Sequence, residues 1–172
     1  MIVIAHRANG FGFKENSADG VGACLDAGII PEVDVWNWEH VSHGPPDADA
    51  LKLKTLLARN KLSRVLVHDK GRSEFKAIGI WPTGILTLAE ADEPGDLFCH
   101  DVDGFVVTDT YEWLTPDGVG ACQAEGQKVL ASGPNIFRHN ERRWLELAAI
   151  GVDGILTDAP AECVKFLEEI GA

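Results

Sequence analysis

The chain has 172 residues, 45% of them hydrophobic, and a formal net charge of −12 at pH 7. This length allows one substantial core, so we expect a single domain over residues 1–172. The acidic balance and the lack of a basic stripe argue against a nucleic-acid partner, because nothing would neutralise the phosphates.

The sequence predicts no membrane-spanning segment. No apolar run approaches the roughly 20 residues that span a bilayer. The first residues lack the basic region and long apolar stretch of a secretory signal, which favours a cytoplasmic protein. The oligomeric state is left open. No CxxC pair occurs, so we expect core or surface thiols at the four cysteines, Cys24, Cys99, Cys122 and Cys163.

Strands and helices are predicted to alternate along most of the chain. The first part predicts strands at 2–5, 29–36, 40–43 and 63–71, and helices at 17–28 (with Ser17 as N-cap) and 47–60 (capped by Asp47 or Asp49). The last part predicts strands at 103–110, 128–135 and 153–160, and helices at 116–126, 140–151 and 161–171. Between them lie strand candidates at 78–81 and 84–88 and a short helix or loop at 89–98.

This alternation predicts an α/β protein built from parallel strand–helix–strand units. About eight strand candidates favour a (β/α)8 TIM barrel, although such barrels usually need roughly 200 residues or more. We therefore expect a compact barrel in which some helices are shortened or missing. The alternative is an open doubly wound sheet, which the lack of a GxGxxG motif after the first strand disfavours.

Polar residues follow the predicted strands at their carboxyl ends. In a parallel barrel these ends share one face, where the active site is built. Taken singly, Asp109 and Asp158 could instead be helix N-caps. The strand-end groups are His6-Arg7, Glu32 and Asp34, His43, His68-Asp69-Lys70, Thr108-Asp109, Ser132 with Asn135, and Thr157-Asp158.

Glu32 and Asp34 are the most informative pair. Residues two apart in a strand point to the same side, so both carboxylates would face the apolar interior. Two buried carboxylates repel each other and lose their hydration, and a divalent cation between them removes both costs. Carboxylate oxygens suit Mg²⁺ or Ca²⁺. The alternative is an edge strand with two solvated acids.

Two imidazoles and a guanidinium complete a candidate site for a phosphate ester. His6 and His43 can take and give protons near neutral pH. Arg7 offers a planar fork of donors that fits a phosphate. With a metal ion beside them, these groups suit phosphoryl chemistry supported by electrostatic stabilisation.

At these positions the sequence resembles the glycerophosphodiester phosphodiesterase family. The family's opening His-Arg-Gly, loop, Pro-Glu-Asn-Thr pattern matches His6-Arg7 and Glu15-Asn16-Ser17, with Ala8 and Lys14 at the glycine and proline positions. Its Glu-x-Asp strand matches residues 32–34, its second histidine matches His43, and its closing strand matches residues 151–160. The resemblance thus spans the whole chain.

The resemblance implies a TIM barrel, a divalent metal ion and two-histidine hydrolysis of a small-molecule phosphodiester. It implies that Glu32 and Asp34 ligate the metal and that Glu15 holds metal or glycerol or orients a histidine. Arg7 would bind the phosphate. His6 and His43 would exchange protons with the attacking hydroxyl and the leaving alcohol.

Several positions depart from the family pattern. The strand-four Glu-x-Lys motif reads His68-Asp69-Lys70, so an imidazole replaces a metal-binding carboxylate while Lys70 remains as an anion contact. An imidazole ligand would shift metal preference toward Mn²⁺ or Zn²⁺, or mark a site that binds metal poorly. The turn before His43 is short, which leaves His40 as a competitor, and the glycerol-binding insertion is absent. Trp36 is a candidate wall of the pocket.

Three functions remain open from the sequence. The first is metal-dependent hydrolysis of glycerophosphodiesters or a related small phosphodiester. The second is a catalytically weak barrel that binds a phosphorylated small molecule through Arg7 and Lys70. The third is a phospholipase D-like lyase that expels an alcohol and leaves a cyclic phosphate.

Overall fold

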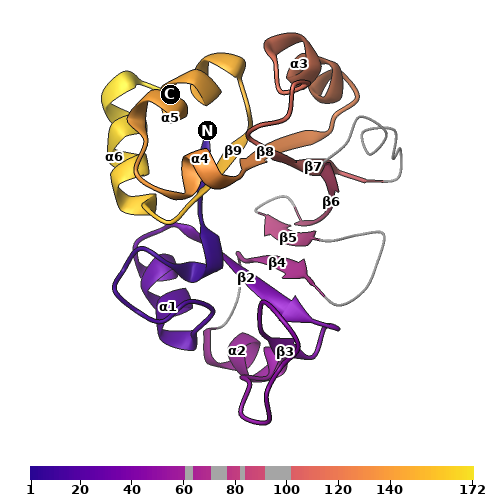
Figure 1. The fold of residues 1–172 in the computed structure, drawn as a ribbon, viewed down its shortest axis with the longest axis vertical. Helices are drawn as coiled ribbons and strands as arrows, with labels where there is room; N and C mark the ends of the chain where they lie inside the picture. Colours follow the sequence, from indigo (N-terminus) through magenta and orange to yellow (C-terminus); the bar gives the residue numbers. More distant parts are fainter. Residues whose placement is uncertain (61–63, 71–76, 82–83, 92–101) are drawn as a thin grey trace.

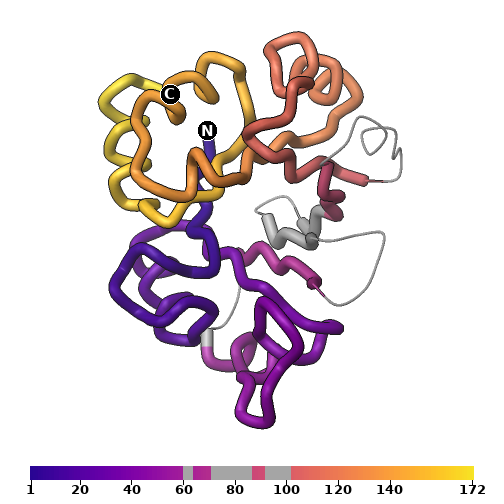
Figure 2. The backbone as a smooth tube through the Cα atoms, in the orientation of Figure 1, coloured from indigo at the N-terminus to yellow at the C-terminus, as the bar shows by residue number. Residues whose placement is uncertain are grey.

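The computed structural model describes residues 1–60, 64–70, 77–81, 84–91 and 102–172 (Figures 1 and 2). Strands and helices alternate over most of this length, as expected. The strands are β1 (Ile2–Ala5), β2 (Ile30–Trp36), β3 (His40–Val41), β4 (Leu66–Asp69), β5 (Ala77–Trp81), β6 (Gly84–Ala91), β7 (Gly104–Thr108), β8 (Lys128–Ser132) and β9 (Gly154–Thr157). The helices are α1 (Ala18–Asp26), α2 (Leu53–Asn60), α3 (Pro116–Ala124), α4 (Pro134–Phe137), α5 (Glu141–Ile150) and α6 (Pro160–Ile170), with a turn, η1 (His6–Ala8), after β1.

All nine strands belong to one curled sheet, so the fold is mixed α/β and resembles a partial TIM barrel. The strand order is β1-β9-β8-β7-β6-β5-β4-β2-β3, and β1 also pairs with β2. Most neighbours are parallel, whereas β5 is antiparallel to both β4 and β6. Only two residues separate β5 from β6, too few for the crossover that parallel neighbours need. The expectation of parallel strands was therefore wrong at β5, and also at β3, which is antiparallel to β2.

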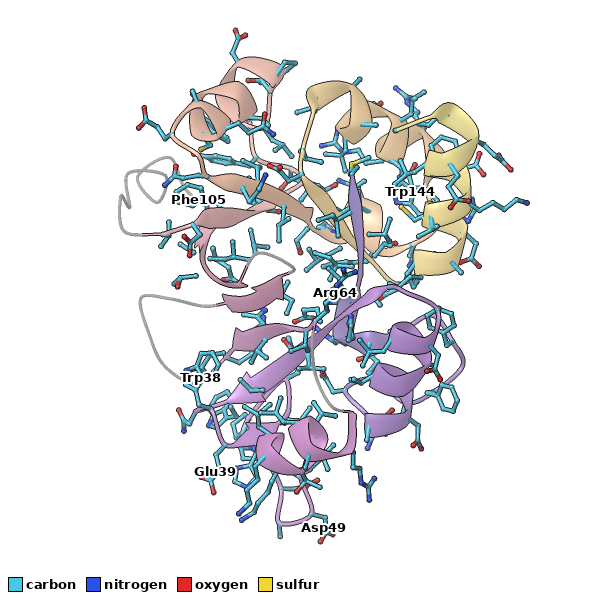
Figure 3. All side chains as sticks on the ribbon, turned by 180° about the vertical axis from the view of Figure 1, so that it is seen from behind. Trp38, Glu39, Asp49, Arg64, Phe105 and Trp144 are labelled. Carbon is cyan, nitrogen blue, oxygen red and sulfur yellow. The ribbon has the colours of Figure 1, made fainter. Side chains whose placement is uncertain are left out.

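Helices cover the outside of this sheet in two groups (Figure 1). One apolar cluster joins β7, β8 and β9 to α3, α5 and α6, and contains Phe105 and Trp144, the two largest fully buried side chains (Figure 3). A second cluster joins β2 and β4 to α1 and α2. Cys24, Cys122 and Cys163 are free and buried in these clusters, and burial raises the pKa of Cys24 to about 11 and of Cys163 to about 12. Cys99 lies outside the described residues.

Local signals set several helix boundaries as expected. The Ser17 hydroxyl accepts a hydrogen bond from the Gly20 N–H, which caps α1. The expected helix at 47–60 begins only at Leu53, because Leu51 and Leu53 bond to the backbone of Val41 and Glu39. The sequence did not predict α4. Residues 89–91 continue β6, while the rest of the helix or loop expected at 89–98 lies outside the described residues.

The inner face of the sheet carries a layer of apolar side chains. Each comes from a different strand, and alternation along the strands directs them to the same side. The layer consists of Ile4, Ile30, Leu66, Leu88, Val106, Leu130 and Leu156. Among the described residues, no helix combines the length and apolar character that crossing a bilayer requires.

This inner layer should carry much of the stability of the scaffold. Leu130 is 0% exposed, so Leu130→Ala should lower the free energy of unfolding by about 2–5 kcal/mol through lost contacts and a residual cavity. Leu145→Ala is the matched control, because Leu145 is 50% exposed on α5. Urea denaturation of both variants measures the effect. Equal losses in the two variants would contradict the assignment of the layer.

Candidate active site

A cavity of about 200 Å³ lies above the inner apolar layer, at the carboxyl ends of the strands. Its floor is formed by apolar residues of that layer. Its polar side belongs to residues expected from strand-end positions. The lining comprises His6, Arg7, Glu32, Leu66, His68, Lys70, Glu90, Val106, Ser132, Phe137 and Leu156.

The polar groups form a second layer, two residues beyond the apolar one on each strand. Side chains two residues apart in a strand share a face, so each strand that supplies an inner apolar residue next supplies a polar group to the same side. This spacing explains why the sequence brings the site together. The members of this polar layer are His6, Glu32, His68, Glu90, Thr108, Ser132 and Asp158.

Glu32 has two oxygens with different surroundings. Its Oε2 accepts a hydrogen bond of 2.6 Å from the backbone N–H of Arg7. Arg7 lies in the left-handed region with φ of 52°, a conformation that costs energy for a residue other than glycine. The other oxygen of Glu32, Oε1, is buried without a hydrogen-bond partner and lies 3.7 Å from Nδ1 of His68. One oxygen is thus held by the chain and the other faces the cavity.

Asp34 shows the same division. Its Oδ2 lies 3.0 Å from Nε of Arg7, 3.0 Å from Nδ1 of His43 and 3.3 Å from Nδ2 of Asn16. Asn16 also accepts a hydrogen bond from the Asp34 backbone N–H. The other oxygen, Oδ1, lies 3.5 Å from Nδ1 of His68 and 3.7 Å from Nζ of Lys70. The carboxylate is therefore fixed through Oδ2.

The remaining atoms of these side chains fit a metal ion. Ligating atoms of Glu32, Asp34 and His68 all lie within 4.8 Å of one another. Both carboxylates are 1% exposed, and Glu32 Oε1 is left without a hydrogen-bond partner, so an ion there would remove a cost of burial. Glu15 lies elsewhere, with Oε2 at 3.2 Å from Nη1 of Arg7. Its expected role stays a prediction.

His68 carries the largest change in acidity at the site. Desolvation lowers its pKa, but polar contact with and charge attraction to the carboxylates of Glu32 and Glu90 outweigh burial and raise it to about 9. Its Nε2 contacts Oε1 of Glu90, while Nδ1 faces Glu32 and Asp34. In the metal-free protein the imidazolium therefore offsets part of the carboxylate charge.

The two candidate acid–base histidines are held in the same way. Nδ1 of His6 lies 3.0 Å from Oδ1 of Asp158, and its ring stacks on Phe137 at 4.0 Å and an interplanar angle of 6°. Nδ1 of His43 lies 3.0 Å from Asp34, and its Nε2 lies 3.4 Å from Nη2 of Arg7. Each ring thus contacts a carboxylate through Nδ1, so Nε2 is the nitrogen available for proton transfer in His6, whereas in His43 it also contacts Arg7.

The structure separates the remaining candidates. His40 pairs with Glu39 at 3.9 Å, so His43 rather than His40 reaches Asp34. Trp36 is half-buried at the end of β2 and does not line the cavity. Asp158 binds His6 instead of capping α6. The sequence reasoning missed Glu90, which its position two residues after Leu88 could have revealed.

Comparison with known proteins supports the fold. No protein-family model matches the sequence, and no curated protein matches it. A phosphodiesterase from Oleispira antarctica, solved in complex with the product sn-glycerol-3-phosphate, aligns over 98% of this chain and 97% of its own, with 14% identity and a TM-score of 0.67. A glycerophosphodiester phosphodiesterase from Parabacteroides distasonis aligns over 99% and 98%, with 14% identity and a TM-score of 0.63.

These likenesses cover nearly the whole of both chains. They confirm, at the level of the fold, the resemblance that the motifs of the sequence indicate. The chain has the fold of the glycerophosphodiester phosphodiesterases, which are phosphoric diester hydrolases.

The raised pKa of His68 predicts how stability depends on pH in the metal-free protein. The pKa of His68 is about 9 in the folded state and 6.5 for an ordinary histidine, as in the unfolded chain. Protonated His68 therefore stabilises the folded state fully below pH 6.5, and this stabilisation is lost as pH rises through 9. With a chelator present, wild-type stability should therefore fall relative to His68→Gln across this window. Urea denaturation from pH 6 to 9.5 measures the difference, and parallel profiles would contradict it.

Proposed function

We propose that this protein is a metal-dependent phosphodiesterase that hydrolyses glycerophosphodiesters, or a related small phosphodiester, to an alcohol and a phosphomonoester. The observation that carries the proposal is the arrangement of His6 and His43. Both rings are held through Nδ1 by carboxylates, Asp158 and Asp34, beside the further metal-binding candidates Glu32 and His68. This is the arrangement that two-histidine acid–base catalysis next to a cation needs.

The metal site proposed here consists of Glu32, Asp34 and His68, with Glu15 as a further candidate that would have to leave Arg7. A bound divalent ion would supply electrostatic stabilisation for the negative charge that develops on the phosphoryl oxygens. Mg²⁺ and Ca²⁺ suit the two carboxylates, whereas the imidazole of His68 favours Mn²⁺ or Zn²⁺.

The chain's own groups would divide the reaction between them. Arg7 and Lys70 line the cavity and would bind the phosphate through their cationic donors. Nε2 of one catalytic histidine would accept a proton from a water molecule as the oxygen of that water forms its bond to phosphorus. As the bond from phosphorus to the leaving oxygen breaks, the other histidine would donate its proton to that oxygen. Asp158 would fix the orientation of the His6 ring and Asp34 that of the His43 ring, and both carboxylates would stabilise the protonated rings.

The size of the cavity and the scaffold support a small substrate. About 200 Å³ suits a phosphate with a short alcohol such as glycerol. The Oleispira antarctica enzyme, which shares the fold, was solved with sn-glycerol-3-phosphate as product. The pairing of β1 with β2 supports a compact TIM barrel over residues 1–172 in which the β4–β5–β6 meander replaces two helical crossovers. Trp36 would contribute only from outside the cavity lining.

Turnover of glycerophosphocholine with a panel of divalent ions tests the function. We expect a phosphomonoester in the ³¹P NMR spectrum, and His6→Ala should slow its formation by about 10²–10⁴-fold, the usual worth of a positioned acid or base. Asp26→Asn on α1 is the control for assay and folding. A cyclic phosphate product would instead identify a lyase, and ligand binding without either product would identify a phospho-ligand-binding barrel.

Metal binding can be tested separately from turnover. Glu32→Gln removes the charge of a buried candidate ligand and should lower divalent-ion affinity at least tenfold by calorimetry, because even residues that only orient a ligand are worth about 10–100-fold. Asp158→Asn is the matched control, because Asp158 contacts His6 and lies outside the proposed ligand set. It should slow turnover and leave the metal affinity in place. Unchanged affinity in Glu32→Gln would refute the metal assignment.

A further inference from the structure

Glu90 is a charged cavity residue that the proposed reaction does not use. It follows Leu88 on β6 and faces the cavity with a side chain 19% exposed. Its Oε1 contacts Nε2 of His68, the ring nitrogen on the side away from Glu32 and Asp34. His68 is thus held between carboxylates on both sides.

This contact determines which ring nitrogen can bind a cation. Nε2 of His68 pairs with Glu90 as an ion pair, without the geometry of a hydrogen bond. A carboxylate can accept a proton but offers none when ionised, so this contact favours the proton on Nε2. In a neutral imidazole the other nitrogen, Nδ1, then carries the lone pair. Nδ1 is the atom that lies 3.7 Å from Glu32 Oε1 and 3.5 Å from Asp34 Oδ1. Three donor atoms therefore converge on one point.

We propose that Glu90 is a positioning residue that orients His68 to bind a metal ion through Nδ1. This inference rests on the proposed metal-dependent function. It adds a role for Glu90 and assigns the proton of neutral His68 to Nε2. Histidines that bind metals commonly donate their second N–H to a carboxylate, which fixes the ring and makes the ligand more basic.

The same arrangement indicates the class of ion. Two carboxylate oxygens and one imidazole nitrogen form a mixed donor set, whereas Ca²⁺ and Mg²⁺ prefer oxygen ligands alone. Imidazole ligands suit Zn²⁺ and other transition ions, and carboxylates also suit Mn²⁺. Glu90 would favour such ions by keeping Nδ1 of His68 available. The site should therefore bind Mn²⁺ and Zn²⁺ more tightly than Ca²⁺, and His68→Glu should reduce this preference.

Titration calorimetry with Mn²⁺, Zn²⁺ and Ca²⁺ on four proteins tests the role of Glu90. Glu90→Leu removes the acceptor at similar size and should weaken Mn²⁺ and Zn²⁺ binding by about 10–100-fold, as for other residues that orient a ligand. Glu90→Gln keeps an acceptor oxygen and should restore most of the affinity. Glu141→Leu is the matched control, since Glu141 contacts Nε2 of His139 at 3.2 Å outside the site. It should change nothing.

A second measurement needs no variant. Long-range ¹H–¹⁵N spectra of the Zn²⁺-loaded wild type should show His68 with a metal-bound Nδ1 and a protonated Nε2. A metal-bound Nε2 in these spectra would overturn the role of Glu90. In the calorimetry, wild-type affinity in Glu90→Leu would overturn it as well.

The outcomes also separate this inference from the proposed function. Binding that Glu32→Gln weakens but Glu90→Leu leaves intact would overturn the role of Glu90 alone. A wild type that binds none of the three ions would overturn the metal site and the role of Glu90 together.

Discussion

The burial of two carboxylates on one face of β2 is the constraint on which this site depends. Glu32 and Asp34 are each 1% exposed and two residues apart, so without partners they would repel each other and lose their hydration. Much of the surrounding polar structure offsets that cost. Arg7 contributes its backbone N–H to Glu32 and its guanidinium to Asp34, and holding these contacts fixes a left-handed backbone conformation with φ of 52°. This left-handed residue lies just after β1, which pairs with β2, so the contacts join the first two parallel strands.

The two oxygens of each carboxylate are stabilised to different extents, and the less stabilised oxygens are the ones available for chemistry. One oxygen of each is tied to the polypeptide, whereas the other faces Nδ1 of His68. A proton on His68 or a divalent ion would therefore offset the same negative charge, that of Glu32 and Asp34, at the same position. The concentrated negative charge of the carboxylates raises the pKa of His68, and the same carboxylates supply donor atoms for a metal ion.

Sequence reasoning located those site residues whose positions follow from alternation along a strand. It placed Glu32 and Asp34 on one face of a buried strand, and His6 and His68 at strand ends, because neighbouring parallel strands bring these ends together. It did not find Glu90, because the strand expected at 84–88 ended before it and residue 90 fell in the helix or loop expected at 89–98, whereas β6 continues to Ala91. Nor did it predict that β5 runs antiparallel or that α2 starts at Leu53, since both depend on backbone pairing between distant residues.

The antiparallel strand also explains how a short chain keeps a site of this kind. Inserting one reversed strand between β4 and β6 restores the original direction, so β6 again runs parallel to β7. The carboxyl end of β6 therefore lies at the same edge as those of β2 and β4. Glu90 reaches His68 from that end, across the position of β5. Although β5 is reversed, the direction of β6 still delivers a carboxylate to the cavity, where Glu90 contacts the imidazole that β4 contributes.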